Sequence, residues 1–247
     1  MVDTIIHGDT LDIMSTLEAN SIDMVLCDLP YGTTSCSWDT IVPFDKLWEQ
    51  YNRICKPNSA IVLFSAQPFT SKLVLSNLDN FKHEIIWVKN TPTGMAQASY
   101  APMKYHENIL VFSSSKGKLR TYNPQKEQRE GKGKACYNYE HYCGESNHVK
   151  LDKVKKFYDP DLVNPSSVQL FNTVPNRNGK LHPTQKPVNL CRYLVSTYSN
   201  EYDTILDNCA GSGTSLVASI QEFRHYIGIE SNIDYVNIAN TRVEECF

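Results

Sequence analysis

Residues 204–230 read TILDNCAGSGTSLVASIQEFRHYIGIE, and this stretch decides the fold class. A short apolar strand, Thr204–Asp207, runs into a glycine-rich turn at Gly211–Gly213, which opens a helix over Ser215–Phe223. A second apolar strand follows at Tyr226–Ile229. Strand, tight turn, helix and strand in this order indicate a parallel sheet, because the helix carries the chain back across one face.

The rest of the chain continues this alternation. Apolar runs typical of buried strands lie at Thr4–His7, Ile22–Cys27, Ala60–Ser65, Glu84–Lys89 and Asn108–Phe112, and helical spacing lies at Phe44–Ile54, Pro187–Tyr198 and Ile233–Glu244. These patterns predict an α/β fold with a doubly wound, mostly parallel sheet covered on both faces. Such sheets bind ligands outside the carboxyl ends of their strands. Polar residues follow four of the predicted strands, at 8–9, 28–31, 207–213 and 230, so we expect them to meet at one edge.

Length and composition set the broad class. The 247 residues suffice for one large domain, or for one domain with a sizeable insertion. A hydrophobic content of 41% excludes global disorder, and no apolar run approaches the ~18 residues of a membrane helix. We expect no secretory signal, because no basic stretch followed by an apolar one opens the chain. Eight cysteines without a Cys-x-x-Cys pair suggest reduced thiols in a cytoplasmic protein.

The charge is unevenly distributed. The net charge of −3, taken alone, argues against a nucleic-acid partner. Residues 116–156, however, hold eleven basic and five acidic side chains, a net charge of +6, so the remainder carries −9. This window also holds four tyrosines and four glycines and lacks a periodic apolar pattern. A basic, aromatic loop region suits phosphate contacts and base stacking, although a solvated surface excursion has the same composition.

The glycine-rich turn predicts a cofactor site. Its small residues let a ligand approach the backbone, and the following helix offers free N–H groups to it. Glu230 lies 19 residues beyond Gly211, about the spacing that places a carboxylate on ribose hydroxyls. A dinucleotide fingerprint would need glycine where Leu216 stands, and Gly-Lys-Ser/Thr does not occur. We therefore favour an adenosine-containing cofactor over plain turn chemistry.

Asp28-Leu29-Pro30-Tyr31 suits chemistry on the exocyclic amine of a base. Such an amine is a poor nucleophile, because its lone pair is delocalised into the ring. The Asp28 carboxylate and the Leu29 carbonyl could accept its two N–H bonds and free that lone pair. Pro30 fixes the turn, and Tyr31 could stack on a base taken out of a duplex. A simple strand-ending turn remains the alternative from spacing alone.

The two motifs together resemble those of the amino-group DNA methyltransferases, which use S-adenosylmethionine. The catalytic pattern of that family is Asp/Asn/Ser-Pro-Pro-Tyr/Phe/Trp, from which Leu29 departs at a position that contributes its carbonyl. The catalytic motif precedes the cofactor motif, as in the permuted beta group. Further matching segments are Ile6–Asp9 with Leu11, Lys104–Leu110 and His182–Pro187.

This resemblance implies a Rossmann-like fold of the class I methyltransferase type, circularly permuted, with residues 1–115 and 176–247 as the catalytic domain and the loop-rich insertion 116–175 as the target-recognition region. It implies a catalytic role for Asp28, Leu29, Pro30 and Tyr31. The cofactor-binding residues that it implies are Asp9, Thr184, Gln185, Lys186, Asp207, Ala210, Gly211, Ser212, Gly213, Thr214 and Glu230. In a permuted sheet, the strands ending near Asp9 and at Glu230 should be near neighbours.

The implied reaction is methyl transfer from S-adenosyl-L-methionine to the N6 amine of a flipped adenine in double-stranded DNA. Asp28 favours adenine, since serine at this position leans toward cytosine. Transfer to the N4 amine of cytosine and a non-catalytic nucleic-acid-binding relative are the alternatives. The resemblance also implies a bacterial or phage context and makes a homodimer and a cognate restriction nuclease the further partners to test.

Four other candidates carry less weight. Cys136, His141, Cys143 and His148 match no common zinc-finger spacing, so we assign no metal. No Pro-Cys dipeptide occurs, which disfavours methylation of a ring carbon. His106 and Glu107 are expected to be part of the pocket framework rather than an acid–base pair. Trp38 and Asp39 follow a Gly/Ser/Thr-rich loop, Gly32–Ser37, that could close over a bound base; a core anchor is the alternative role for Trp38.

Overall fold

A computed structural model describes residues 2–32, 40–128, 161–175, 181 and 185–247. The chain forms two compact units. The larger unit combines Met1–Asn123 with Ser167–Phe247, and the smaller one is Pro124–Ser166. The chain therefore leaves the larger unit later and re-enters it earlier than the limits predicted for the insertion, 116 and 175.

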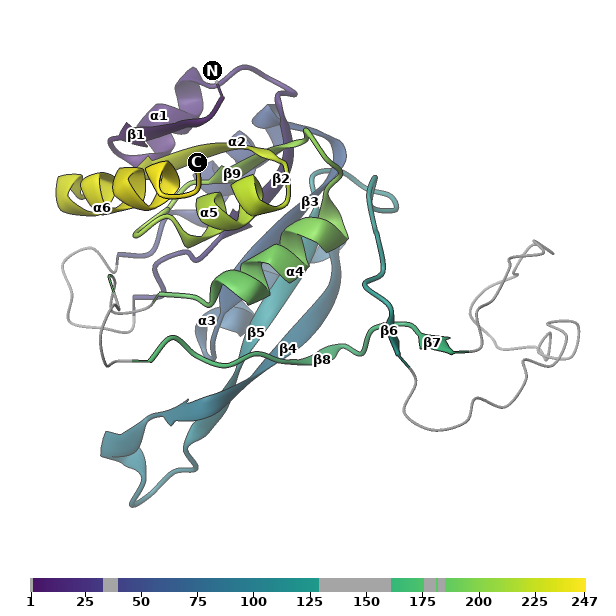
Figure 1. Cartoon of the computed structure of the whole chain (residues 1–247), viewed down its shortest axis with the longest axis vertical. Coiled ribbons are helices and arrows are strands. Elements are labelled where there is room, and N and C mark those ends of the chain that lie inside the picture. Colours follow the sequence, from purple (N-terminus) through teal and green to yellow (C-terminus); the bar gives the residue numbers. More distant parts are fainter. Residues whose placement is uncertain (1, 33–39, 129–160, 176–180, 182–184) are drawn as a thin grey trace, which may run out of the picture. The chain divides into compact units, whose positions relative to one another are not determined.

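The larger unit is built on one sheet, whose described strands follow the order β1-β10-β9-β2-β3-β5-β4-β8 (Figure 1). The strands are β1 (Thr4–His7), β2 (Ile22–Cys27), β3 (Cys55–Ser65), β4 (Phe81–Thr93), β5 (Lys104–Ser113), β8 (Val168–Leu170), β9 (Thr204–Asp207) and β10 (His225–Glu230). Neighbours run parallel except at β5, which is antiparallel to both β3 and β4. The predicted α/β class with a mostly parallel sheet is confirmed.

The first and last strands of the chain lie side by side. β1 pairs in parallel with β10, with Thr4 opposite Ile227 and His7 opposite Glu230. This pairing confirms the prediction that the strands ending near Asp9 and at Glu230 are neighbours in the sheet. It also brings the turn after β1 next to the turn after β10, because parallel neighbours end at the same edge.

Six α-helices of the described residues cover the sheet: α1 (Thr10–Thr16), α2 (Phe44–Ile54), α3 (Phe69–Ser76), α4 (Val188–Tyr198), α5 (Thr214–Gln221) and α6 (Ile233–Glu244). Short 3₁₀ turns lie at Leu78–Asn80 and Met95–Gln97. One core cluster joins the sheet to α1, α2 and α3, and another joins its opposite face to α4 and α5. Strand β2 feeds both, because Val25 belongs to the first cluster and Met24 to the second. Burial on both faces explains its continuous apolar run.

The structure adds elements that apolar spacing did not predict. Helices α1 and α3 are short. Asp9 is the N-cap of α1, and its Oδ1 accepts the backbone N–H groups of Leu11 and Asp12 at 2.8 and 3.2 Å. Strand β3 starts at Cys55, five residues before its predicted start at Ala60, and includes Pro57. Strands β4 and β5 also exceed the predicted spans, because they continue as a hairpin arm beyond the sheet (Figure 1).

The described part of the smaller unit is a two-stranded antiparallel ribbon. Strand β6 (Glu127–Gln128) pairs with β7 (Leu162–Val163). Residues 129–160 between them lie outside the described residues. That stretch carries seven of the eleven basic side chains of the 116–156 window, as well as Cys136, His141, Cys143 and His148.

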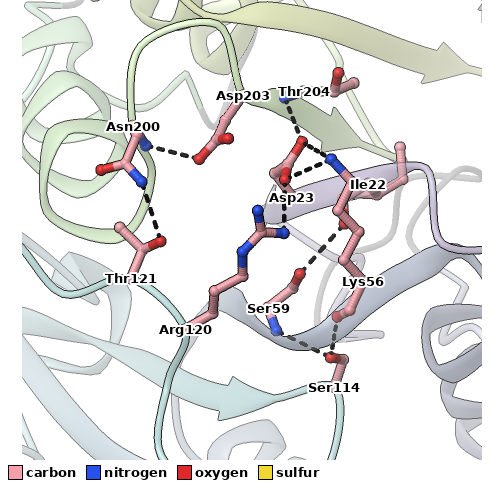
Figure 2. Close-up of polar contacts among 10 residues, drawn as sticks. All are labelled: Ile22, Asp23, Lys56, Ser59, Ser114, Arg120, Thr121, Asn200, Asp203 and Thr204. Atoms are coloured by element: carbon pink, nitrogen blue, oxygen red, sulfur yellow. Dashed lines mark hydrogen bonds and ion pairs between the residues drawn. The ribbon is translucent and has the colours of Figure 1, made fainter.

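A buried carboxylate connects several strands at the start of β2 (Figure 2). Asp23 Oδ1 accepts hydrogen bonds from Lys56 Nζ at 2.8 Å and from Arg120 Nη1 at 3.0 Å. Its Oδ2 accepts the backbone N–H of Thr204 at 3.1 Å. Arg120 belongs to the predicted recognition segment, yet it lies within the larger unit. Lys116, from the same segment, pairs with Asp79 at 2.8 Å.

Candidate active site

A cavity of about 670 Å³ lies at the carboxyl ends of the strands, opposite the Asp23 cluster. It brings together nearly all predicted site residues that the structure describes: Asp9, Asp28, Leu29, Pro30, Tyr31, Gln185, Lys186, Asp207, Ala210, Gly211, Ser212, Thr214 and Glu230. Gly213 does not line it, and Thr184 lies outside the described residues. Segments from the two ends of the chain therefore share one chamber, as the convergence of strand ends predicts.

Asp28 and Tyr31 form one hydrogen-bonded unit on the turn after β2. The Tyr31 hydroxyl donates to Asp28 Oδ1 at 2.7 Å. The Tyr31 ring stacks on Phe69 of α3, with centroids 5.0 Å apart and an angle of 25° between the planes. Burial raises the pKa of Asp28, and the Lys186 ammonium opposes that rise. Burial and the adjacent Asp28 carboxylate also raise the pKa of Tyr31, so its hydroxyl keeps its proton.

Lys186 lies between two carboxylates. Its Nζ is 2.8 Å from Asp28 Oδ2 and 3.1 Å from Glu107 Oε2. Glu107 Oε1 in turn pairs with Lys89 Nζ at 3.0 Å. The ammonium of Lys186 also lies 5.1 Å from the centre of the Phe64 ring, within the range of a cation–π contact.

Lys89 was not predicted as a site residue, although it lines the cavity. Its side chain is 2% exposed, and it stands on β4 in the run Trp87-Val88-Lys89. A lysine inside an otherwise apolar strand was the available signal, since lysine is almost never buried unless it is paired. Glu107 was expected to belong to the pocket framework, and its two ion pairs place it there.

The glycine-rich turn is held by carboxylates from two strands. Asp207, the last residue of β9, accepts a hydrogen bond from the Ser215 hydroxyl and the backbone N–H of Cys209, the latter at 3.1 Å. Glu230 Oε2 accepts the N–H of Gly211 at 2.8 Å, and its Oε1 accepts that of Asn232 at the same distance. Burial raises the pKa of Asp207 to about 7. The turn thus carries one carboxyl group that titrates near neutral pH.

Gly213 has a structural reason to be glycine. Its φ of +74° lies in the left-handed region, and it caps the N-terminus of α5. A Cβ there would lie 2.9 Å from the Cβ of Ala239 on α6. Gly213 therefore lets α5 start at the cavity and pack closely against α6, which accounts for its absence from the cavity wall.

Two of the remaining candidate residues, Gln185 and His106, line the cavity, and two others lie outside the described residues. Gln185 lines the cavity and its Oε1 accepts the N–H of Leu181 at 2.9 Å. His106 lines the cavity too. Trp38 and Asp39 lie outside the described residues. The described residues contain no cluster of three metal-ligating side chains, and no helix among them is long and apolar enough to cross a membrane.

The mostly parallel sheet, the glycine-rich turn before a helix and the Asp-Leu-Pro-Tyr turn share one chamber, as the resemblance to the amino-group DNA methyltransferases implies. The chain belongs to the N6/N4 family of DNA methylases, whose family model matches residues 22–241.

Known members and solved structures match over nearly the whole chain. The type II methyltransferase M.HpaI of Haemophilus parainfluenzae is 29% identical, over 98% of this chain and 74% of that protein. The DNA adenine methyltransferase YhdJ of Escherichia coli is 28% identical, over 98% and 82%. The crystal structure of the M1.HpyAVI–SAM complex has a TM-score of 0.63 and 23% identity, over 97% and 98%, and confirms the fold.

Proposed function

We propose that this DNA methyltransferase transfers a methyl group from S-adenosyl-L-methionine to the N6 amine of an adenine flipped out of double-stranded DNA. One observation carries the proposal. The Asp28–Tyr31 turn and the glycine-rich turn open into the same cavity, so a base amine and a bound cofactor would meet there. The name of the related YhdJ, a DNA adenine methyltransferase, supports adenine as the base.

The cavity suits an adenosine-containing, cationic cofactor. The carboxylate of Glu230 ends β10 where ribose hydroxyls would be bound, and α5 begins at the glycine-rich turn. The carboxyl groups of Asp9 and Asp207 add negative charge for a sulfonium. We assign cofactor binding to these residues together with Thr184, Gln185, Lys186, Ala210, Gly211, Ser212, Gly213 and Thr214. When bound, the cofactor supplies an electrophilic methyl group and leaves as a neutral thioether.

We assign the catalytic roles to the Asp28–Tyr31 turn. Asp28 accepts one N–H of the base amine, and the Leu29 carbonyl accepts the other, which frees the nitrogen lone pair. Asp28 already accepts from Tyr31 and Lys186, but an ionised carboxylate has about four lone-pair sites, so two remain. Pro30 fixes the turn, and Tyr31 stacks on the base from a ring held by Phe69. Positioning supplies much of the barrier reduction.

Cytosine N4 is the second candidate base. Cytosine presents the same arrangement as adenine, an exocyclic amine beside a ring-nitrogen acceptor, so the same turn could bind either amine. Asp28 at the first motif position and the adenine-specific relative favour adenine. A non-catalytic relative would be expected to lack the carboxylate or the aromatic ring of the motif, and this chain keeps both.

Target recognition is proposed for the insertion, residues 116–175, of which Pro124–Ser166 forms its own compact unit. The net charge of +6 over 116–156 supports contact with DNA phosphates. A homodimer and a cognate restriction nuclease remain the partners that the family resemblance predicts.

The direct test is to incubate the full chain with unmethylated plasmid and S-adenosylmethionine, digest the DNA, and quantify nucleosides by mass spectrometry. N6-methyladenine is the expected product. N4-methylcytosine would instead support the second candidate, and neither product would contradict both. Asp28→Ala should abolish the product yet still bind cofactor, measured by calorimetry. Glu49→Gln, on the exposed face of α2, is the matched control and should behave as wild type.

A further inference from the structure

Four side chains of alternating charge form a continuous chain along one wall of the cavity. Lys89 contacts Glu107, Glu107 contacts Lys186, and Lys186 contacts Asp28, at 3.0, 3.1 and 2.8 Å. They come from β4, from β5, from the segment before α4 and from the turn after β2. The proposed function uses Asp28 for catalysis and leaves the ion pairs of the other three unexplained.

Burial makes this chain a fixed electrostatic feature. The side chains of Lys89 and Lys186 are 2% and 10% exposed, so the ion pairs with their carboxylate partners offset the cost of burying each ammonium. Burial lowers the pKa of Lys186, but Asp28 and Glu107 outweigh it and raise the pKa above its usual value. Burial raises the pKa of Glu107, but Lys186 and Lys89 hold it below its usual range. Lys186 and Glu107 are therefore both charged at neutral pH.

The two charges act on Asp28 in opposite directions. The Lys186 ammonium favours the ionised form of Asp28, whereas the Glu107 carboxylate disfavours it. Lys186 alone would make Asp28 a weak base, and Glu107 alone would keep it protonated. Other titratable groups that interact with Asp28 are the Tyr31 hydroxyl, the Asp207 carboxyl and the thiols of Cys27 and Cys191, and burial raises the pKa of the Cys191 thiol as well. Burial raises the pKa of Cys27 and of Tyr31, so both stay neutral.

We propose that Lys186 and Glu107 are positioning residues that fix the orientation and the ionisation of Asp28 for amine methylation. This inference rests on the proposed function. During transfer, the amine lone pair forms the N–C bond while the electron pair of the breaking S–C bond stays on sulfur. The nitrogen then carries one proton too many, which passes to an Asp28 oxygen and on to water. Asp28 must be ionised to accept the amine N–H, yet basic enough to take that proton.

The inference predicts pH shifts of opposite sign. We would measure the single-turnover rate of methyl transfer from pH 5 to 9, with DNA and cofactor saturating. Lys186→Met removes the charge that favours ionised Asp28, so the acid limb of the profile should move to higher pH. Glu107→Gln removes the opposing charge, so the acid limb should move to lower pH. Each shift should be about half a pH unit or more. Lys186→Arg keeps the charge and should restore the wild-type limb.

Controls separate this role from a purely structural one. Lys72→Met on α3 and Glu49→Gln on α2 repeat the substitution types at exposed positions and should keep the wild-type profile. Cofactor affinity of Glu107→Gln should stay within about threefold of wild type, since its effect is assigned to Asp28. Circular dichroism and thermal melts report folding; if Lys186→Met does not fold, the downward shift of Glu107→Gln decides the question.

Several results would overturn the inference. Shifts in the same direction, or rates that fall without any shift of the acid limb, would leave Lys186 and Glu107 as structural residues. A large loss of cofactor affinity in Lys186→Met with an unshifted profile would leave Lys186 with its proposed cofactor-binding role alone. An inactive wild-type chain would contradict the proposed function itself. That outcome differs from an active wild-type enzyme whose variants show no shift of the acid limb, which contradicts only this inference.

Discussion

The Glu230 carboxylate at the end of β10 accepts the backbone N–H of Gly211 at 2.8 Å, 19 residues earlier in the chain. This contact fastens the glycine-rich turn to the next strand of the sheet. The same carboxylate lines the cavity, so it both shapes the turn and is available to a ligand.

Glu230 can be tested by separating these two roles. Glu230→Gln keeps an oxygen acceptor for Gly211 but loses the charge, whereas Glu230→Ala loses both. We expect cofactor affinity to fall about tenfold in the first variant and about 100-fold in the second, roughly 1.4 kcal/mol for each step. Isothermal titration calorimetry measures both. Wild-type affinity in the alanine variant would contradict the assignment of Glu230.

Tyr31 combines a hydrogen bond with a stacking surface. Tyr31→Phe loses the hydrogen bond to Asp28 but keeps the ring on Phe69, so the single-turnover rate should fall about 3- to 10-fold. Tyr31→Ala also removes the stacking surface and should cost about 10- to 100-fold more, in line with about 1–3 kcal/mol for base stacking. Equal rates for the two variants would show that the ring does not contact the base.

Asp207 should make stability depend on pH. The unfolded chain ionises this carboxyl near its ordinary pKa of 3.8, whereas burial in the fold raises the pKa to about 7. Between these values the folded state binds more protons, so the Asp207 contribution to the free energy of unfolding falls as pH rises. Urea unfolding from pH 4.5 to 7.5 should show this decline in wild type and a flatter curve in Asp207→Asn. Parallel curves would rule out the raised pKa.

Asp23 connects β2 with β3, β9 and the Arg120 segment at the edge of the sheet opposite the cavity. Asp23→Ala leaves Lys56, Arg120 and the Thr204 N–H without their acceptor. We expect a loss of about 1–3 kcal/mol in the free energy of unfolding, because both cations are partly exposed and can recover water. Cofactor affinity should be unchanged. A stability within about 0.5 kcal/mol of wild type would mean that the cluster contributes little.

All four described basic side chains of the basic window are exposed, but they differ in their partners. Lys116 and Arg120 form ion pairs with Asp79 and Asp23, and Lys118 and Lys126 are the two chosen for charge reversal. Lys118→Glu with Lys126→Glu should weaken DNA binding and make its dependence on salt shallower, by roughly one unit of slope for each phosphate that the variant no longer neutralises. Fluorescence anisotropy at several salt concentrations measures this. An unchanged slope would assign these lysines to plain surface.

The sequence by itself determined the buried strands of the sheet and the positions at which they end. Mostly apolar runs such as Ile22–Cys27, which Asp23 alone interrupts, predicted strands buried on both faces, and the structure buries every residue of β2. The end of each strand could be located because a polar or glycine residue interrupts the apolar run, as Asp28 does after Cys27. Since the carboxyl ends of parallel strands meet at one edge, the sequence predicted that the residues after these strands would line one cavity, and most of the described ones do.

Elements with weak periodicity were not predictable in the same way. Helices α1 and α3 have seven and eight residues, too few for a clear apolar repeat. The extra length of β4 and β5 arises from pairing with each other, which depends on a partner strand and not on local composition. The paired roles of Lys116 and Arg120 were hidden for the same reason, because a basic residue has the same sequence signature whether it faces DNA or an internal carboxylate.

Only the tertiary structure decided how the charged side chains of the site pair with one another. Lys186 could be assigned from its motif to the cofactor side, but its ammonium lies between Asp28 and Glu107. Lys89 attracted no functional interpretation until its ion pair with Glu107 was seen. Apolar burial is encoded by local periodicity, whereas an ion pair depends on atoms from distant segments meeting at hydrogen-bonding distance. Such meetings are set by the packing of the sheet and its turns, and no spacing along the chain reports them.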